Sequence, residues 1–421
     1  MVSMRDAEVD TPLNAPPPAE IGGAADTSRV AAAAMGTPAW QRAGYSIAAM
    51  RGLAQRVLPR PIFDFADGGA EDERTLARNE QGFADLALVP RPLQGAAQRD
   101  LSLTLFGRRL SMPVLIGPTG LAGLFCPDGE RATARAAAAA GTAYCLSHGS
   151  VCALEALAGM RAAPRWMQVF VYKDRVFTRE MIDRAAAAGY DALVLTVDNQ
   201  LMGNRERDVR NHFCIPPRFT AWQLLAMSRQ LPWLWRMRHA LRGLTLGNYM
   251  RPGSYLDFAS LAGRLASLLD PALCWEDVRQ IRDQWKGTLL LKGVLHPAEA
   301  TQATRLGVDG IVVSNHGGRQ LDGAVSSIDA LPQIVQALHA ADSAMTLLLD
   351  GGVRRGADVV KALAVGARAV LVGRPQLWGL AVAGEAGVAH VLEIYRREID
   401  RTMGLVGART LAEIDGTLLA P

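Results

Sequence analysis

Residues 310–322 read Gly310-Ile311-Val312-Val313-Ser314-Asn315-His316-Gly317-Gly318-Arg319-Gln320-Leu321-Asp322. An apolar run that is typical of a buried strand ends abruptly in a polar segment with a histidine and an arginine. The ordinary pKa of histidine suits proton transfer near neutral pH, and a guanidinium suits a carboxylate. The glycines between them would let the backbone approach a flat ligand. A solvated loop with a capping histidine is the competing interpretation, and the rest of the chain has to decide between the two.

The same unit recurs along the chain from about residue 110: a short apolar run, a polar loop and an Ala-rich amphipathic stretch. The apolar runs are Pro113–Gly117, Ala143–Leu146, Arg165–Val171, Ala192–Val197, Thr288–Leu291, Gly310–Val313, Thr346–Leu349 and Ala369–Val372. Helices are predicted between them at Glu130–Ala140, Arg179–Ala188, Pro297–Leu306, Ile328–Ala341 and Ala357–Val365. Glycines follow several of these helices, as C-caps do, at Gly141, Gly189, Gly307 and Gly366.

Eight alternating β and α units predict an α/β fold of the (β/α)8 TIM barrel type. A doubly wound sheet is the alternative, but no Gly-x-Gly-x-x-Gly follows the first predicted strand. We expect a disordered leader over residues 1–36, and then one barrel domain over 37–415 with an N-terminal helical extension. A long insertion between strands 4 and 5 covers residues 209–260.

The composition restricts the classes of function. With 421 residues, 49% hydrophobic and 20% charged, the chain is that of a soluble globular protein. The net charge of +4 gives no nucleic-acid signal. The chain contains no run of about 18 uncharged apolar residues, and so the sequence does not predict a membrane-spanning helix. The five cysteines are scattered without a Cys-x-x-Cys pair, which argues against a metal site and favours a reducing compartment.

Active sites of such barrels lie at the carboxyl ends of the strands, and polar groups follow nearly every predicted strand here. These groups are Thr119, Ser147, Gln168, Thr196, Asp198, Arg205, Lys292, Ser314, His316, Arg319, Asp350, Arg354 and Arg374. The glycine-containing loops after strands 7 and 8, with Arg354 and Arg374, resemble a phosphate site. Ordinary tight turns with surface arginines are the competing interpretation of these two loops.

Two residues of this rim leave several roles open. Lys292 ends an apolar strand and could form a Schiff base, stabilise a developing negative charge, or form a structural ion pair. Asp198 could orient His316 and stabilise its protonated form, or it could cap the next segment. Together with a phosphate site, this set suits removal of a proton and a hydride from an anionic substrate, with electrons passing to a phosphate-bearing cofactor.

In these motifs the chain resembles the FMN-dependent L-2-hydroxy acid oxidases and dehydrogenases over roughly residues 45–410. The motifs are Gly69-Ala70-Glu71-Asp72, Gly117-Pro118-Thr119-Gly120, Thr196-Val197-Asp198, Arg205-Glu206, Leu291-Lys292-Gly293, the Ser314–Asp322 signature, Asp350–Gly356 and Val372-Gly373-Arg374. The stretches Gly117–Gly123 and Gly203–Pro216 look closest to the mandelate dehydrogenases of that family. The resemblance implies oxidation of an L-2-hydroxy acid to its 2-keto acid with FMN as cofactor, and a homotetramer.

The resemblance also assigns expected roles by position. His316 is implied as the base and Asp198 as its partner, with Arg319 as the anchor of the substrate carboxylate and Arg205 as a second cation at the substrate. The residues implied at the flavin ring and ribityl chain are Thr119, Ser147, Gln168, Thr196, Lys292 and Ser314. Those implied at the FMN tail are Asp350, Gly352, Arg354, Gly373 and Arg374. No metal site is implied. The sequence leaves open whether His316 takes the hydroxyl proton or the α-proton.

Two residues depart from the family pattern. Phe65 and Phe170 stand where the family usually has tyrosines whose hydroxyls help to bind the substrate. Each loss removes a hydrogen bond worth on the order of 1 kcal/mol or more. Gly149 replaces a bulkier family side chain. The departures indicate a bulky or aromatic hydroxy acid, or else a non-carboxylate or amine substrate.

The insertion indicates the electron acceptor. Residues 209–256 contain seven arginines, no acidic residue, and Trp222, Trp233, Trp235 and Tyr249. A basic, Trp-rich segment can lie on an anionic membrane, which favours a quinone acceptor and a cytoplasmic protein that is peripheral on the inner face of the cell membrane. A folded lid or a subunit contact is the alternative for the segment. An oxygen-dependent oxidase and a Schiff-base aldolase using Lys292 are the alternative enzymes.

Overall fold

The computed structural model describes residues 37–160, 162–213, 230–241, 244–249 and 268–421. The predicted leader, residues 1–36, and most of the predicted insertion, residues 209–260, lie outside the described residues. Residues Ala43–Pro421 form one compact unit. Helix α2 spans Ala39–Ala43, so its last residue is the first of this unit.

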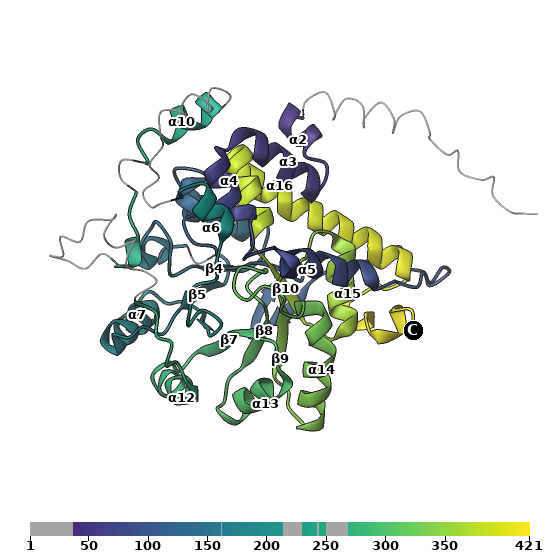
Figure 1. Cartoon of the computed structure of the whole chain (residues 1–421). Coiled ribbons are helices and arrows are strands. Elements are labelled where there is room, and N and C mark those ends of the chain that lie inside the picture. The colour runs from purple at the N-terminus through teal and green to yellow at the C-terminus, as the bar shows by residue number, and fades with distance from the viewer. Residues whose placement is uncertain (1–36, 161, 214–229, 242–243, 250–267) are drawn as a thin grey trace, which may run out of the picture. The chain divides into compact units, whose positions relative to one another are not determined.

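Eight parallel strands close into a barrel, with β10 pairing with β3 to complete the ring. They are β3 (Val114–Ile116), β4 (Tyr144–Leu146), β5 (Arg165–Val169), β6 (Ala192–Thr196), β7 (Thr288–Val294), β8 (Gly310–Val313), β9 (Thr346–Leu349) and β10 (Ala369–Val372). All eight coincide with predicted apolar runs, and the predicted (β/α)8 barrel is confirmed. Figure 1 shows the helices outside the strands, with α14 beside β8 and β9.

The helices that alternate with the strands are α6 (Gly129–Ala139), α7 (Arg175–Ala187), α13 (Pro297–Arg305), α14 (Ser327–Ala340) and α15 (Gly356–Val365). All five match predicted helices, within four residues at either end. The predicted C-cap glycines adopt positive φ, from 68° at Gly307 to 126° at Gly366. Such φ values are open to glycine at no steric cost, and so the helices end where the sequence places a glycine.

Other helices lie before the first barrel strand, in the loops, and after the last strand. They are α3 (Ile47–Val57), α4 (Arg60–Asp67), α5 (Arg74–Asp85), α8 (Glu206–Arg210), α10 (Leu231–Met237), α12 (Trp275–Gln284) and α16 (Arg374–Val406). Short 3-10 turns are η1 (Ala122–Leu124), η2 (Leu154–Leu157), η4 (Gly247–Tyr249), η5 (Leu411–Glu413) and η6 (Gly416–Leu418). The expected N-terminal helical extension is present as α3, α4 and α5.

Two predicted boundaries were wrong for identifiable reasons. Strand β7 runs past Leu291 because Lys292 stays in the ladder, where it pairs with Thr196, and a bulge follows it. Gly293 permits that bulge with a φ of 106°. Helix α7 starts at Arg175, four residues before the predicted start, because the Asp174 carboxylate caps the backbone N–H groups of Val176 and Phe177.

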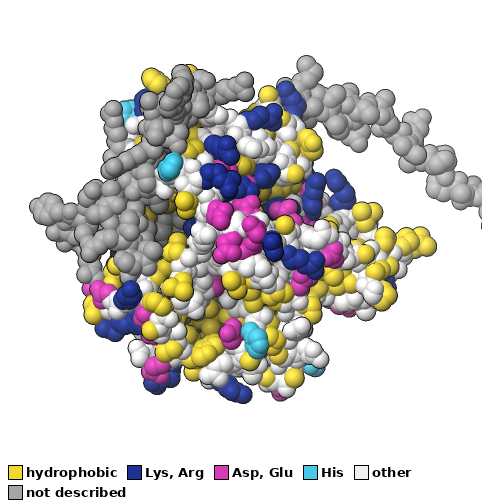
Figure 2. Space-filling view, viewed as in Figure 1, with side chains coloured by type: hydrophobic (Ala, Val, Ile, Leu, Met, Phe, Trp, Pro, Cys, Tyr) yellow, Lys and Arg dark blue, Asp and Glu magenta, His cyan; other side chains and the backbone are white. Residues whose placement is uncertain are grey.

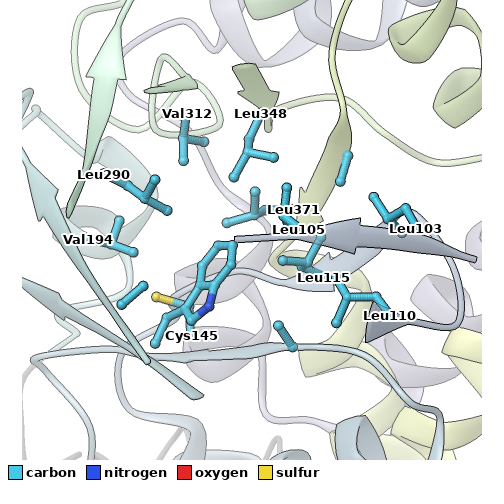
Figure 3. Close-up of a cluster of buried hydrophobic side chains, with 14 residues drawn as sticks. Leu103, Leu105, Leu110, Leu115, Cys145, Val194, Leu290, Val312, Leu348 and Leu371 are labelled. Carbon is cyan, nitrogen blue, oxygen red and sulfur yellow. The ribbon is translucent and has the colours of Figure 1, made fainter. Parts of the chain in front are cut away.

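A hydrophobic cluster fills the barrel at the amino ends of the strands (Figure 3). Leu103, Leu105 and Leu110 enter it from the hairpin of β1 (Leu103–Leu105) and β2 (Arg108–Leu110), and they pack against Val194, Leu290, Val312 and Leu371. Phe106 in the hairpin turn meets Trp166 edge to face, with ring centroids 5.9 Å apart. The hairpin therefore plugs one mouth of the barrel, and the carboxyl ends of the strands form the other.

Helix α16 is a core element of the fold. By length and composition it could cross a membrane, alone among the described helices, but 61% of its most apolar window is buried within the protein. It packs against α3, α6 and α15. Elsewhere on the surface, basic and acidic side chains lie next to one another near the centre of the face shown in Figure 2.

Candidate active site

A cavity of about 310 Å³ lies at the carboxyl ends of the strands. The sequence-predicted residues that line it are Phe65, Thr119, Ser147, Gln168, Phe170, Thr196, Arg205, Lys292, His316, Arg319, Asp350, Gly352, Arg354, Gly373 and Arg374. Asp198 and Ser314 do not line it but lie directly behind it, hydrogen-bonded to His316 and Lys292. The structure thus brings the whole predicted set together.

His316 and Asp198 form a hydrogen-bonded pair. Nδ1 of His316 lies 3.0 Å from Oδ1 of Asp198. The backbone holds the imidazole in place because His316 has a φ of 59° and its N–H donates to Oγ of Ser314 at 3.0 Å. Within the described residues, Nε2 of the imidazole has no hydrogen-bond partner, and so it is the nitrogen that a ligand can reach.

The surroundings set the charge of this pair. Burial lowers the pKa of His316, and the attraction of Asp198 offsets this effect only in part because Lys292 opposes it. Burial alone would raise the pKa of Asp198, but His316 and Lys292 outweigh burial and lower it. The resting pair is therefore a neutral imidazole beside a carboxylate, which is the state that a proton acceptor requires.

Lys292 is a buried ammonium two residues before the end of β7. Its Nζ donates to Oγ of Ser314 at 2.9 Å and lies 3.0 Å from Oδ2 of Asp350. Burial would lower its pKa, but Asp350 and Asp198 raise it above the ordinary lysine value. A Schiff-base lysine needs the opposite shift, because only the neutral amine is a nucleophile. The surroundings of Lys292 thus favour a fixed positive charge over the aldolase alternative.

Two arginines supply positive charge next to His316. Nη1 of Arg319 donates to the carbonyl oxygens of Phe65 and Gly68 at 2.8 and 2.9 Å, and its guanidinium lies 5.4 Å from the Phe65 ring centroid. Arg205 is half-buried, and its Nε is a buried atom with no partner among the described residues. Burial lowers the pKa of Arg319, and Arg205 and Arg374 lower it further. Neither guanidinium forms an ion pair with a carboxylate in the described structure, so an anionic ligand would complete this site.

A second cationic region lies at the loops after β9 and β10. Arg374 donates to the carbonyl oxygens of Asp67 and Gly68 at 3.1 and 2.8 Å. Burial and the nearby Arg354 lower its pKa to about 10. Gly373 stands at the N-terminus of helix α16, whose first segment runs to a kink at Ala383 and Gly384, and the dipole of that segment favours an anion. This region can therefore hold a phosphate.

At Gly352 the loop after β9 comes too close to the backbone of helix α5 to carry a side chain. Gly351 and Gly352 have φ values of 88° and 85°. A Cβ at Gly352 would lie 2.0 Å from the carbonyl oxygen of Asn79. Both glycines line the cavity, so the backbone itself faces the ligand space.

Unpaired polar atoms face the middle of the cavity. Oε1 of Gln168 accepts from the backbone N–H of His148 at 3.1 Å, but its Nε2 is buried without a partner in the described structure. Oγ1 of Thr196 is likewise buried without one. Since buried polar groups are rarely left unpaired, these atoms fit the polar edge of a ring system. Together with the cationic loops, they fit FMN.

The two phenylalanines lie on the cavity wall with aromatic neighbours. Phe65 stacks on Phe213, with ring centroids 4.7 Å apart and planes at 19°. Phe170 lies 5.7 Å from His148 and 6.4 Å from Tyr172, centroid to centroid. The wall around both positions is therefore less polar than the tyrosines implied by the resemblance would make it.

Several cavity residues received no role from the sequence: Asn199, Met202, Leu246, Tyr249 and Leu269. Asn199 and Met202 follow Asp198 in the loop after β6, and their position after a barrel strand could have revealed them. Tyr249 and Leu246 come from the inserted segment, where no local pattern distinguishes a cavity residue from a surface residue. Only the three-dimensional fold places them here.

Comparisons with known proteins agree with this geometry. Residues 54–421 match the model of the FMN-dependent dehydrogenase family. L-lactate dehydrogenase of Caulobacter vibrioides is 44% identical over 371 residues, which cover 88% of this chain and 96% of the relative. L-lactate oxidase of a Nostoc species is 43% identical over 371 residues, 87% and 95% of the two chains.

Solved structures show the same likeness. A monotopic membrane protein, (S)-mandelate dehydrogenase, superimposes with a TM-score of 0.84 at 37% identity, covering 89% of this chain and 99% of the other. A mandelate oxidase superimposes with a TM-score of 0.76 at 36% identity, covering 89% and 98%. On its fold, its cavity and these matches, the chain belongs to the family of FMN-dependent dehydrogenases.

Proposed function

We propose that this enzyme uses FMN to oxidise an L-2-hydroxy acid to the 2-keto acid. One observation carries the proposal: a neutral His316 held by Asp198 shares a cavity with two arginines, Arg319 and Arg205, that have no carboxylate partner among the described residues. A base and an anion site next to each other are what an α-hydroxy carboxylate requires. Relatives named for L-lactate and (S)-mandelate, both L-2-hydroxy acids, support the substrate class.

The cofactor is assigned to two parts of the cavity. Thr119, Ser147, Gln168, Thr196 and Lys292 would surround the flavin ring and the ribityl chain, with Ser314 behind Lys292. Asp350, Gly352, Arg354, Gly373 and Arg374 would hold the tail and its phosphate. When bound, FMN accepts the two electrons and the hydrogen that leave the substrate. The ammonium of Lys292 stays protonated and would face the ring edge, where negative charge develops.

The chain's own residues bind and deprotonate the substrate. Arg319 and Arg205 bind the carboxylate and orient the α-carbon. Nε2 of His316 accepts a proton from the substrate, and the Asp198 carboxylate stabilises the imidazolium that forms. Both cations and the His316–Asp198 pair are half-buried, so solvent screens these interactions less than it would at the open surface.

The substrate is proposed to be bulky or aromatic, as mandelate is. Phe65 and Phe170 offer no hydroxyl to a small hydroxy acid. A Cβ built at Gly149 would meet its nearest atoms at 3.8 Å, an ordinary van der Waals distance, so the glycine leaves the space of at least a methyl group on the cavity wall. The non-carboxylate or amine substrate that the phenylalanines also allow is less well supported, because Arg319 and Arg205 would then lack an anion.

A quinone at the membrane is the proposed electron acceptor. The described part of the insertion supports this idea at α10, where Trp233 is 2% exposed but Trp235 is 70% exposed and Leu231 61%. Arg236 anchors the helix through the carbonyl oxygens of Phe125 and Ala381, at 3.2 and 2.8 Å. An anchored helix with an exposed Trp and Leu suits a lipid interface. Cytoplasmic location at the inner membrane face, and a homotetramer, complete the proposal.

Anaerobic mixing of the purified enzyme with a panel of L- and D-2-hydroxy acids tests the function. We expect bleaching of the bound flavin by an L-acid with a large side chain, followed by faster reoxidation with a quinone analogue than with oxygen. His316→Asn should retain FMN but lose flavin reduction. Bleaching by amines alone, or by no hydroxy acid, would overturn the proposal. Oxygen as the faster acceptor would overturn only the choice of acceptor.

A further inference from the structure

Behind Phe170 lies a chain of three hydrogen-bonding side chains that the proposed chemistry does not use. The hydroxyl of Tyr172 is hydrogen-bonded to Nε2 of His148 and lies 2.8 Å from the hydroxyl of Tyr249. His148, Tyr172 and Tyr249 are all buried, with exposed fractions of 0%, 1% and 6%. Only Tyr249 of the three lines the cavity. The chain of hydrogen bonds therefore runs from the barrel wall to the ligand space.

The imidazole of His148 fixes the direction of this chain. Its Nδ1 is buried and has no hydrogen-bond partner among the described residues. A buried N–H without a partner is rarer in proteins than a bare acceptor atom, so the single ring proton belongs on Nε2. Burial, reinforced by Arg184, also lowers the pKa of His148 to about 3, so the ring stays neutral.

The remaining donors follow in order. Nε2–H of His148 donates to the hydroxyl oxygen of Tyr172, and the Tyr172 proton is then free to go to the hydroxyl oxygen of Tyr249. The Tyr249 hydroxyl has no other hydrogen-bond partner among the described residues, so its own proton can point into the cavity. Burial raises the pKa of both phenols, which therefore keep their protons over the working pH range.

We propose that Tyr249 is a substrate-binding residue whose hydroxyl donates a hydrogen bond to an oxygen atom of the bound hydroxy acid, in place of a hydroxyl at Phe170. Tyr172 and His148 are positioning residues that act through Tyr249. The Phe170 ring lies 6.4 Å from that of Tyr172 and 5.7 Å from that of His148, so the donor enters the cavity from the same wall. The proposal rests on the proposed function, since the ligand is its substrate.

The test compares Tyr249→Phe with the wild-type enzyme in two measurements. The first is the steady-state oxidation of L-mandelate, which gives kcat and KM. The second is the Kd of its 2-keto product, read from the change that binding causes in the flavin absorption spectrum. A lost hydrogen bond to a charged or polar oxygen should raise KM and Kd by about ten- to a hundredfold. FMN content should stay unchanged, because Tyr249 is not among the residues assigned to the cofactor.

Two further variants separate substrate binding from a structural role. Tyr190→Phe is the matched control, since this buried tyrosine donates to the carbonyl oxygen of Leu154 at 2.8 Å and does not line the cavity. The Tyr190→Phe variant should keep KM and Kd within about twofold of the wild-type values. Adding Phe170→Tyr to Tyr249→Phe should recover part of the lost binding, a result that a merely destabilised loop would not give.

The positioning role of Tyr172 is read from a double-mutant cycle. If Tyr172 acts only through Tyr249, Tyr172→Phe will weaken binding in the wild type but add nothing to Tyr249→Phe. Unchanged KM and Kd in Tyr249→Phe, with a wild-type flavin that L-mandelate reduces, would overturn this inference and leave the proposed function standing. If no 2-hydroxy acid reduces the wild-type flavin, both fall together.

Discussion

The charge on Asp198 should account for a large part of the rate of substrate deprotonation. When His316 accepts a proton, an ion pair forms across the 3.0 Å between its Nδ1 and Oδ1 of Asp198. At this distance and an effective dielectric constant of about 20, Coulomb's law gives an attraction of about 5.5 kcal/mol. Asp198→Asn keeps the shape and one hydrogen bond but removes that charge.

Solvent reduces the expected effect. The His316 side chain is 24% exposed, so we expect about half of the attraction, about 2.7 kcal/mol, to be lost in the variant. This loss corresponds to a rate of flavin reduction about a hundredfold lower. Rapid-mixing measurement of flavin bleaching under anaerobic conditions gives the rate directly. KM should change less, because the charge matters only after the proton has moved.

The pH profile of the same variant provides an independent check. The neutral form of His316 is the active one, so kcat/KM falls as the pH drops through its pKa. Burial already places that pKa below the ordinary histidine value, and Lys292 and Arg205 lower it while Asp198 raises it. Removing the Asp198 charge should therefore lower the pKa of His316 further, and move the acid limb of the profile to lower pH.

The matched control is Asp277→Asn. Asp277 is also buried and ion-paired, with its Oδ1 2.8 Å from Nε of Arg175, but it does not line the cavity. It should leave both the reduction rate and the acid limb unchanged. A rate for Asp198→Asn within threefold of the wild type, or an acid limb that stays in place, would refute the role of the Asp198 charge.

Three other perturbations test separate parts of the site. Phe65→Tyr with Phe170→Tyr should lower KM for a small acid such as L-lactate by about five- to tenfold, and unchanged kinetics would show that these positions do not select the substrate. Lys292→Met should lower the midpoint potential of bound FMN by about 30 mV or more, which equals about 1.4 kcal/mol for two electrons. Anaerobic dye titration measures this potential, and an unchanged value would contradict a positive charge at the ring edge. Trp235→Ser should shift the protein from the membrane pellet to the soluble fraction, whereas Leu405→Ser, at a residue that is also exposed (62%), should not. A wild-type enzyme that is soluble without detergent would contradict the membrane proposal.

The barrel could be predicted from the sequence because its signals are local. Each strand is an apolar run buried on both faces, and the run ends where polar site residues begin, as Gly310–Val313 shows before Ser314. The C-cap glycines mark the helix ends in the same local way. The error at β7 arises because the prediction used local signals only. A lysine after an apolar run looks like the end of a strand. The partners that allow Lys292 to remain inside the strand, Asp350 and Ser314, come from other loops.

The elements outside the repeat could not be predicted in this way. Nothing near Leu103 or Phe106 indicates that a hairpin plugs the barrel, since the strands that bury them lie far along the chain. The chain of hydrogen bonds from His148 to Tyr249 is equally non-local, because it joins residues that are 101 positions apart in the sequence. Their roles appear only after folding. Sequence reasoning found most of the charged rim residues that follow strands, but it missed Asn199 and Met202 after β6 and the residues that arrive from the insertion.

The carbonyl group of Gly68 connects the two ends of the site. It accepts from Nη1 of Arg319 at 2.9 Å and from Nη2 of Arg374 at 2.8 Å, although the first lies at the proposed carboxylate site and the second at the proposed phosphate site. A Cβ at Gly68 would lie 2.8 Å from the carbonyl oxygen of Asp64, so glycine permits this close turn after α4. The two positively charged guanidinium groups repel each other, and neither has a carboxylate partner in the described residues. An anion bound at either end relieves this repulsion, and it follows that FMN phosphate and substrate carboxylate should each favour the binding of the other.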